Sequence, residues 1–115
     1  MAIEGSYERH PDLGCEALVF IDPESGACFQ IQRDLPGGPH DDEHCVTTGM
    51  SAPVYGGVVQ WRRVPPTGSE GERFEFALNR RATALFADDV ISFEVVPRDG
   101  QTVDELAAHV ERLLS

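Results

Sequence analysis

The densest group of potential metal ligands in the chain is the run from His40 to Cys45, which reads His-Asp-Asp-Glu-His-Cys. Imidazole, carboxylate and thiolate groups are the ligands that zinc uses in proteins. His40 and His44 would share one face of a helix, but the preceding Pro-Gly-Gly-Pro sequence is typical of a loop. No second ligand cluster follows downstream. We therefore predict an exposed acidic loop over residues 34–44, with Cys45 turning inward, and neither a metal site nor a bound cofactor.

Nucleophilic catalysis would need a cysteine beside a histidine that acts as a base. The chain has three cysteines and four histidines, but no local signature such as a GxSxG elbow joins a nucleophile to a base. Cys28 stands within an apolar alternation and His109 on the flank of a helical pattern, so packing and surface display explain both positions. The sequence therefore predicts no catalytic residues, and a small Cys/His enzyme is the least favoured alternative.

The segment VYGGVVQW, residues 54–61, raises the question of a phosphate-binding glycine loop. Such loops lead into a helix N-terminus and usually carry a lysine. Gly56 and Gly57 instead precede a strand-like run, and the chain contains no lysine. We predict that the two glycines are structural, allowing positive φ or a β-bulge that lets Tyr55 and Trp61 face chosen surroundings.

The elements that position these residues follow from apolar patterning. Alternation bounded by turns predicts strands over residues 16–21, 27–33, 58–64, 73–78 and 90–96. Residues 80–87 suit one or two helical turns. From Thr102 to Ser115, apolar residues recur at helical spacing behind a capping box of Thr102 and Glu105. The predicted fold is α+β, a mostly antiparallel sheet with this C-terminal amphipathic helix packed on one face.

A chain of 115 residues predicts one domain over residues 1–115. Residues 1–14 are polar and mildly acidic, and we expect them to form a flexible N-terminal extension. They show no basic segment followed by an apolar one, as a secretory signal would. The odd number of cysteines, Cys15, Cys28 and Cys45, without CxxC spacing, favours reduced thiols. We predict a cytoplasmic protein.

Charge is the strongest global signal in the sequence. Twenty acidic against nine basic residues give a formal net charge of −11. Such a field repels nucleic acid and anionic membranes and speeds encounters with basic proteins. No apolar run approaches the roughly 20 residues of a membrane-spanning helix. The charge therefore favours either a basic protein partner or an acidic surface that only keeps a small protein soluble, and it predicts that neither nucleic acid nor membrane is bound.

Segments in a fixed order carry a family resemblance: ALVFIDPESGACFQIQR, HCVTTGMSAPVYGGVVQW, RFEFALNRRATALF and ISFEVV, followed by the terminal helix. This order resembles immunity protein family 10 of bacterial polymorphic toxin systems, over roughly residues 15 to 114. YGGVVQW is its most specific piece. The resemblance implies a non-enzymatic antitoxin that binds a cognate toxin. It supplies no catalytic residues and no toxin identity.

Charge and resemblance together predict where a partner binds. A basic toxin, such as a nuclease, would meet an acidic loop that steers the encounter, and an exposed aromatic anchor would hold it. The predicted partner-binding residues are Asp41, Asp42, Glu43, Tyr55, Asp88 and Asp89. The main alternative is an intracellular homodimer, unrelated to toxins, that pairs sheet edges or the helix face.

Overall fold

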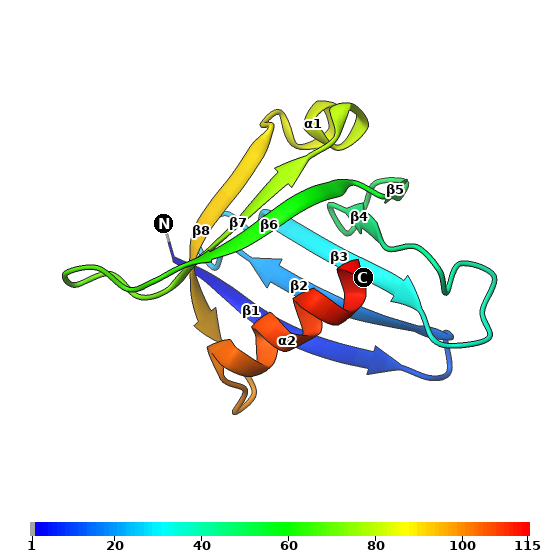
Figure 1. Cartoon of the computed structure of the whole chain (residues 1–115), viewed down its shortest axis with the longest axis horizontal. Helices are drawn as coiled ribbons and strands as arrows, with labels where there is room; N and C mark the ends of the chain where they lie inside the picture. The colour runs from blue at the N-terminus through cyan, green and yellow to red at the C-terminus, as the bar shows by residue number, and fades with distance from the viewer. Residues whose placement is uncertain (1) are drawn as a thin grey trace.

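The fold is α+β and is built on one curled, mostly antiparallel sheet of eight strands (Figure 1). The computed structural model describes residues 2–115. The elements in chain order are β1 (Ala2–His10), β2 (Cys15–Ile21), β3 (Cys28–Asp34), β4 (Cys45–Thr47), β5 (Val54–Tyr55), β6 (Val58–Val64), β7 (Arg73–Leu78), α1 (Arg80–Phe86), β8 (Val90–Pro97) and α2 (Val103–Leu114). The strand order across the sheet is β5-β4-β3-β2-β1-β8-β7-β6. The pairing of β1 with β8 is parallel, whereas the other paired strands are antiparallel.

Within the segment expected to be a flexible extension, residues 2–10 instead form β1, an interior strand of the sheet, and residue 1 lies outside the described residues. Strand β1 pairs with β2 from Glu4 to His10 on one side and with β8 from Ala2 to Gly5 on the other. Gly5 lies opposite Phe20, and a Cβ at Gly5 would stand 2.9 Å from that ring. Glycine here makes room for the core, so this strand lacks the continuous apolar alternation that would reveal it.

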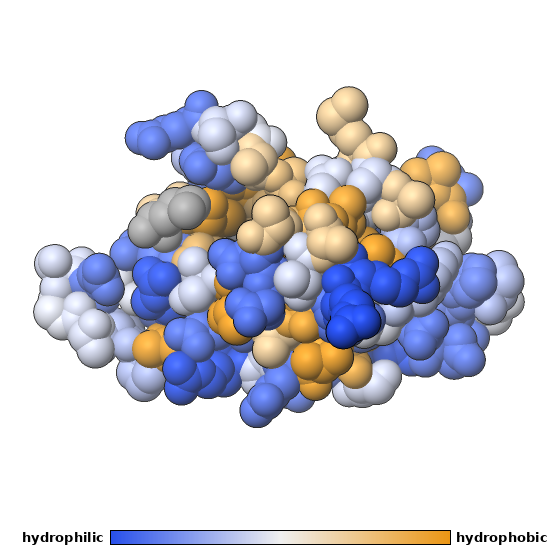
Figure 2. Space-filling model, turned by 90° about the horizontal axis from the view of Figure 1, so that it is seen from above, coloured by the Kyte–Doolittle hydropathy of each residue, from blue (hydrophilic) through white to orange (hydrophobic). Residues whose placement is uncertain are grey.

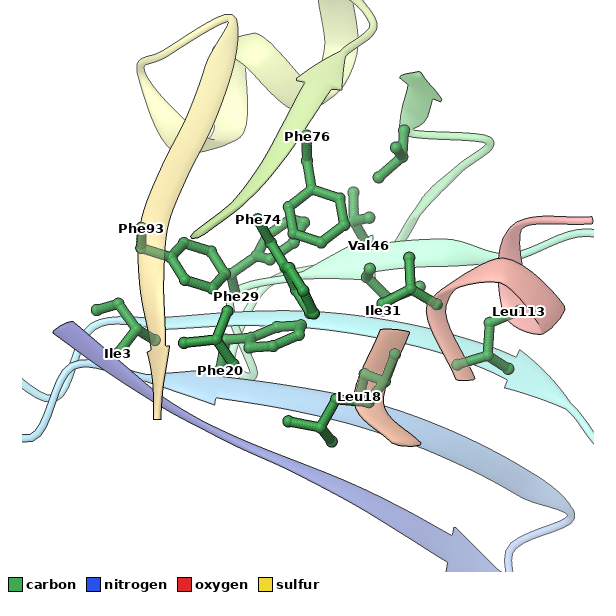
Figure 3. Close-up of a cluster of buried hydrophobic side chains, with 14 of the residues drawn as sticks. Ile3, Leu18, Phe20, Phe29, Ile31, Val46, Phe74, Phe76, Phe93 and Leu113 are labelled. Atoms are coloured by element: carbon green, nitrogen blue, oxygen red, sulfur yellow. The ribbon is translucent and has the colours of Figure 1, made fainter. Parts of the chain in front are cut away.

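The core fills the concave side of the curled sheet. Phenylalanines from β2, β3, β7 and β8 point toward one another, as Figure 3 shows for Phe20, Phe29, Phe74, Phe76 and Phe93. Phe20 and Phe93 have ring centroids 5.0 Å apart, and Phe29 and Phe76 are 5.2 Å apart. Aromatic pairs at these separations add to the stabilisation from burial alone.

Helix α2 packs on this concave face, as the sequence predicted. Thr102 and Glu105 form the expected capping box. The apolar stripe is buried through Leu106, Ala107, Val110 and Leu113. At the other end, the Arg33 guanidinium donates hydrogen bonds to the carbonyls of Arg112, Leu113 and Ser115. A cation from β3 therefore satisfies the last carbonyls of α2, where the helix dipole also favours positive charge.

A buried carboxylate makes a second link between α2 and the sheet. Glu16, on β2, accepts hydrogen bonds from the Tyr7 hydroxyl at 2.7 Å and from Arg112 Nη1 at 2.6 Å. His109 stacks on the Tyr7 ring with a centroid separation of 3.7 Å. Burial, followed by the positive charge of Arg112, lowers the pKa of His109. These contacts hold α2 at one position along the sheet.

Several other predicted elements match the structure closely. The hairpin of β2 and β3 runs in register from Cys15 opposite Asp34 to Ile21 opposite Cys28. Strands β6, β7 and β8 and the short helix α1 lie where the patterning placed them. Across residues 2–115, neither helix has the length and apolar character that crossing a membrane would require.

Candidate functional site

A polar hollow of about 270 Å³ lies on the face of the sheet opposite α2. Gln32, Cys45 and Tyr55 are paired neighbours on β3, β4 and β5, and alternation turns their side chains away from the core. The loops before β4 and before β5 form the walls. The hollow is lined by Cys15, Gln32, Arg33, Asp34, His40, Glu43, Cys45, Thr47, Gly49, Ser51, Pro53 and Tyr55.

Tyr55 stands in this hollow beside the acidic loop. Its side chain keeps an exposed fraction of 36%. Its ring lies 4.7 Å from the His40 ring, centroid to centroid, and Glu43 lines the same hollow. Burial, with a further contribution from acidic groups that include Glu43, raises the pKa of Tyr55. The structure thus brings together Tyr55 and part of the predicted acidic surface, and the phenol stays neutral.

The acidic loop is held in place by its own hydrogen bonds. Asp41 accepts the Gly37 N–H at 2.9 Å, and its carbonyl accepts from Arg33 Nε at 2.7 Å. The carboxylate of Asp34 accepts the His40 N–H at 2.9 Å. Asp41, Asp42 and Glu43 are nevertheless exposed. The loop therefore presents negative charge from a fixed backbone, which lowers the ordering cost of binding.

Asp88 and Asp89 belong to a different part of the surface. They follow α1, where the Asp89 carbonyl accepts the Leu78 N–H at 2.9 Å. Asp88 lines a separate, apolar hollow that shares no lining residue with the one around Tyr55. In Figure 1 the end of α1 and the loop after β3 stand at different corners of the molecule. The structure does not join these two aspartates to the surface around residues 41–43.

The two glycines after Tyr55 have different structural roles. Gly56 has a φ of 65°, in the left-handed region that favours glycine. Gly57 does not have positive φ, but a Cβ there would overlap Cγ2 of Val46. A bulge does occur, one step later, between Val58 and Gln60. Gly56 is therefore needed for its positive φ, and Gly57 is needed because the Val46 side chain approaches it closely.

Trp61, on β6, packs against the core. Its ring lies 5.4 Å from that of Phe74, and its indole N–H donates to Glu111 of α2 at 3.1 Å. This hydrogen bond links β6, a terminal strand of the sheet, to α2 on the concave face.

His44, considered above only as a potential metal ligand, ties the turn at Gly56 to β6. It is buried, its Nε2 accepts the Val58 N–H at 3.1 Å, and its carbonyl accepts the Gly56 N–H at 2.9 Å. Burial, with a smaller contribution from Arg33, lowers the pKa of His44 below its ordinary value of 6.5. A neutral imidazole is what this acceptor role requires. Nothing in the local sequence distinguishes this role from that of His40.

We expect stability to fall with acidification because of His44. Below about pH 6.5 the unfolded chain takes up a proton at His44 that the folded chain resists, so unfolding becomes easier by up to about 1.4 kcal/mol per pH unit. Urea denaturation of wild type and His44→Gln at pH 7.5 and 5.5 measures this. The variant should lose less stability, keeping a residual loss from His109. Equal losses would contradict the assignment.

Cys45 and Cys15 do not have the environment of a nucleophile. Cys45 is buried, and burial raises its pKa to about 11. Burial, followed by the negative charge of Asp34, also raises the pKa of Cys15. A reactive thiol needs the opposite shift. Over residues 2–115, no group of three or more metal-ligating side chains converges in the structure.

No protein-family model, curated protein or solved structure matches this chain.

Proposed function

We propose that this protein is a non-enzymatic immunity protein that binds and neutralises a cognate toxin carrying a basic surface. The observation that carries the proposal is the placement of Tyr55 beside His40 and Glu43, in one hollow walled by the acidic loop. An exposed aromatic ring next to fixed negative charge suits a basic protein surface. The net charge of −11 acts in the same direction.

Each part of this surface would serve a different stage of binding. The carboxylates of Asp41, Asp42 and Glu43 would attract the toxin at a distance and raise the association rate. Tyr55 would then bury its ring in the partner and lower the dissociation rate. A nuclease is the favoured toxin class, since nucleases carry positive charge to bind phosphate.

The environment of the thiols supports a binding function over a catalytic one. With a pKa of about 11, roughly one Cys45 thiol in ten thousand would be ionised at pH 7. His40, the histidine in the same hollow, lies against Tyr55 with its ring tilted by 36° to the phenol ring. A Cys/His enzyme would need an activated thiol that this hollow does not supply.

A homodimer is the second candidate function, because β6 is a terminal strand of the sheet. Val59, at the bulge in that strand, has an exposed fraction of 64%. A terminal strand presents unpaired backbone groups to a second copy. Analytical ultracentrifugation separates the candidates, since a monomer at all concentrations would remove the homodimer.

We expect that neutralising the acidic loop slows toxin association. The triple variant Asp41→Asn, Asp42→Asn and Glu43→Gln should reduce the association rate about threefold to tenfold at low salt and weaken its salt dependence. Binding to the protein encoded by the neighbouring gene is measured by surface plasmon resonance. Tyr55→Ala should instead raise the dissociation rate, by about tenfold or more.

A matched control removes three negative charges elsewhere, through Glu24→Gln, Glu70→Gln and Asp99→Asn. If both triple variants slow association equally, the loop is not the contact surface. If wild type neither binds the neighbouring protein nor protects cells that express it, the immunity function is wrong for that toxin.

A further inference from the structure

A second hollow, of about 430 Å³, lies between the β2–β3 turn, the end of α1 and the start of β8. We call it the anchor pocket. Its lining is mainly hydrophobic and consists of Ile3, Phe20, Asp22, Ser25, Ala27, Cys28, Phe29, Phe86, Asp88, Ile91, Ser92 and Phe93. Its volume falls within the roughly 300–1,000 Å³ typical of binding pockets. Hydrophobic residues reach the surface on the side of the molecule that Figure 2 shows.

The floor of the anchor pocket is made of core side chains. Phe20, Phe29 and Phe93 are almost fully buried and belong to the aromatic core. Phe86, at the end of α1, makes an edge contact with Phe29 at a centroid distance of 5.2 Å. A floor made of packed core side chains does not collapse when empty, so binding would need little rearrangement.

The rim of the anchor pocket is acidic. Asp22 accepts hydrogen bonds from the Glu24 N–H at 2.9 Å and from the Ser25 hydroxyl at 3.0 Å, and these bonds lower its pKa. Asp88, across the hollow, is exposed, as is its neighbour Asp89. Asp88, which has no place at the Tyr55 hollow, therefore lines an apolar one, and Asp89 is its neighbour in the sequence.

We propose that the anchor pocket binds one aromatic or large aliphatic side chain of a partner protein, from a segment in which arginine or lysine flanks that side chain. This inference goes beyond the proposed function, because it concerns a surface separate from the Tyr55 hollow and specifies the chemistry of the segment bound there. The apolar floor would take the side chain, and Asp22 and Asp88 would pair with its basic neighbours. A lipid or nucleotide would bring phosphate toward the same carboxylates and be repelled.

The experiment titrates ¹⁵N-labelled protein with acetyl-Gly-Arg-Phe-Arg-Gly-amide and follows amide shifts by NMR. We expect saturable shifts at Ile3, Phe86 and Ile91, with a Kd of roughly 0.1–1 mM for so short a peptide. Replacing the Phe of the peptide by Ser removes the side chain that fills the pocket and should weaken binding about tenfold or more. Replacing both Arg by Glu should weaken it as much, because the new negative charges are repelled by the acidic rim.

Three variants of the protein test the location. Ala27→Trp fills the anchor pocket from its rim and should weaken binding about tenfold, whereas Ala84→Trp, on the exposed side of α1, should leave it unchanged. Asp88→Asn with Asp89→Asn should weaken binding about threefold at low salt and less at high salt. Spectra of the free variants confirm that they fold.

Shifts centred on Tyr55, equal binding of the Ser peptide, or unchanged binding by Ala27→Trp would each overturn the inference. The peptide experiment uses no toxin, so its failure is distinct from failure of the immunity function. If the peptide binds but the neighbouring toxin does not, the anchor pocket stands and the toxin assignment falls.

Discussion

An aspartate in place of Val110 is expected to destabilise the domain severely. Val110 is fully buried, in the stripe of α2 that packs on the concave face of the sheet. A carboxylate placed there loses its hydration and gains no partner. We expect a cost above about 4 kcal/mol, a large part of the roughly 5–15 kcal/mol by which such domains are stable. Circular dichroism during thermal melting measures the effect.

Two further variants of α2 separate burial from helix propensity. Ala108→Asp places the same charge on an exposed position of the helix and should cost less than about 1 kcal/mol. Leu106→Ala removes a buried side chain without adding charge and should cost about 2–5 kcal/mol. A melting curve for Val110→Asp that matches wild type would show that α2 does not pack as described.

Valine in place of Gly57 is expected to be nearly as damaging. The first atom of any side chain at this position would overlap Cγ2 of Val46, within the core, and would approach Cβ of Ala82 at 3.3 Å. The valine side chain adds two methyl groups, and neither Val46 nor Ala82 has room to move away from them. We expect a loss of about 3 kcal/mol or more in the free energy of unfolding, measured by urea denaturation.

The mechanism can be separated from backbone strain by a double-mutant cycle. Gly57→Ala should cost less when Val46→Ala is already present, because the overlapping methyl group is gone. Gly56→Ala, where φ is positive, should cost about 1–2 kcal/mol whether or not Val46 is intact. If the cost of Gly57→Ala does not depend on Val46, the close approach is not what this glycine permits.

Elements with local signals were predictable from the sequence. Helix α2 carries its own capping box and a complete apolar stripe, so its bounds and buried face follow from nearby residues. The β2–β3 hairpin likewise contains its turn. Strand β1 was not predicted, because one of its paired strands, β8, is distant in sequence. In addition, its Gly5 is explained only by the Phe20 ring that it faces.

The candidate site, like the fold, was only partly predictable from the sequence. Glu43 and Tyr55 were identified separately, and the antiparallel pairing of β4 with β5 brings them to one hollow. Asp88 resembles the loop aspartates in charge and exposure, so no sequence pattern separates them. The acceptor role of His44 depends on a backbone N–H fourteen residues later, at Val58. Only the folded chain brings those groups together.

The parallel pairing of β1 with β8 has a consequence for how the chain folds. Ile3 is aligned with Val95, so β1 gains its second neighbour only when β8, which follows it later in the chain, has been made. Pairings between such distant segments slow folding, since a long loop must close first. Until then, one edge of β1 is open to other chains. Synthesis that stalls before residue 90 should therefore yield an aggregation-prone nascent chain, which a chaperone would have to shield.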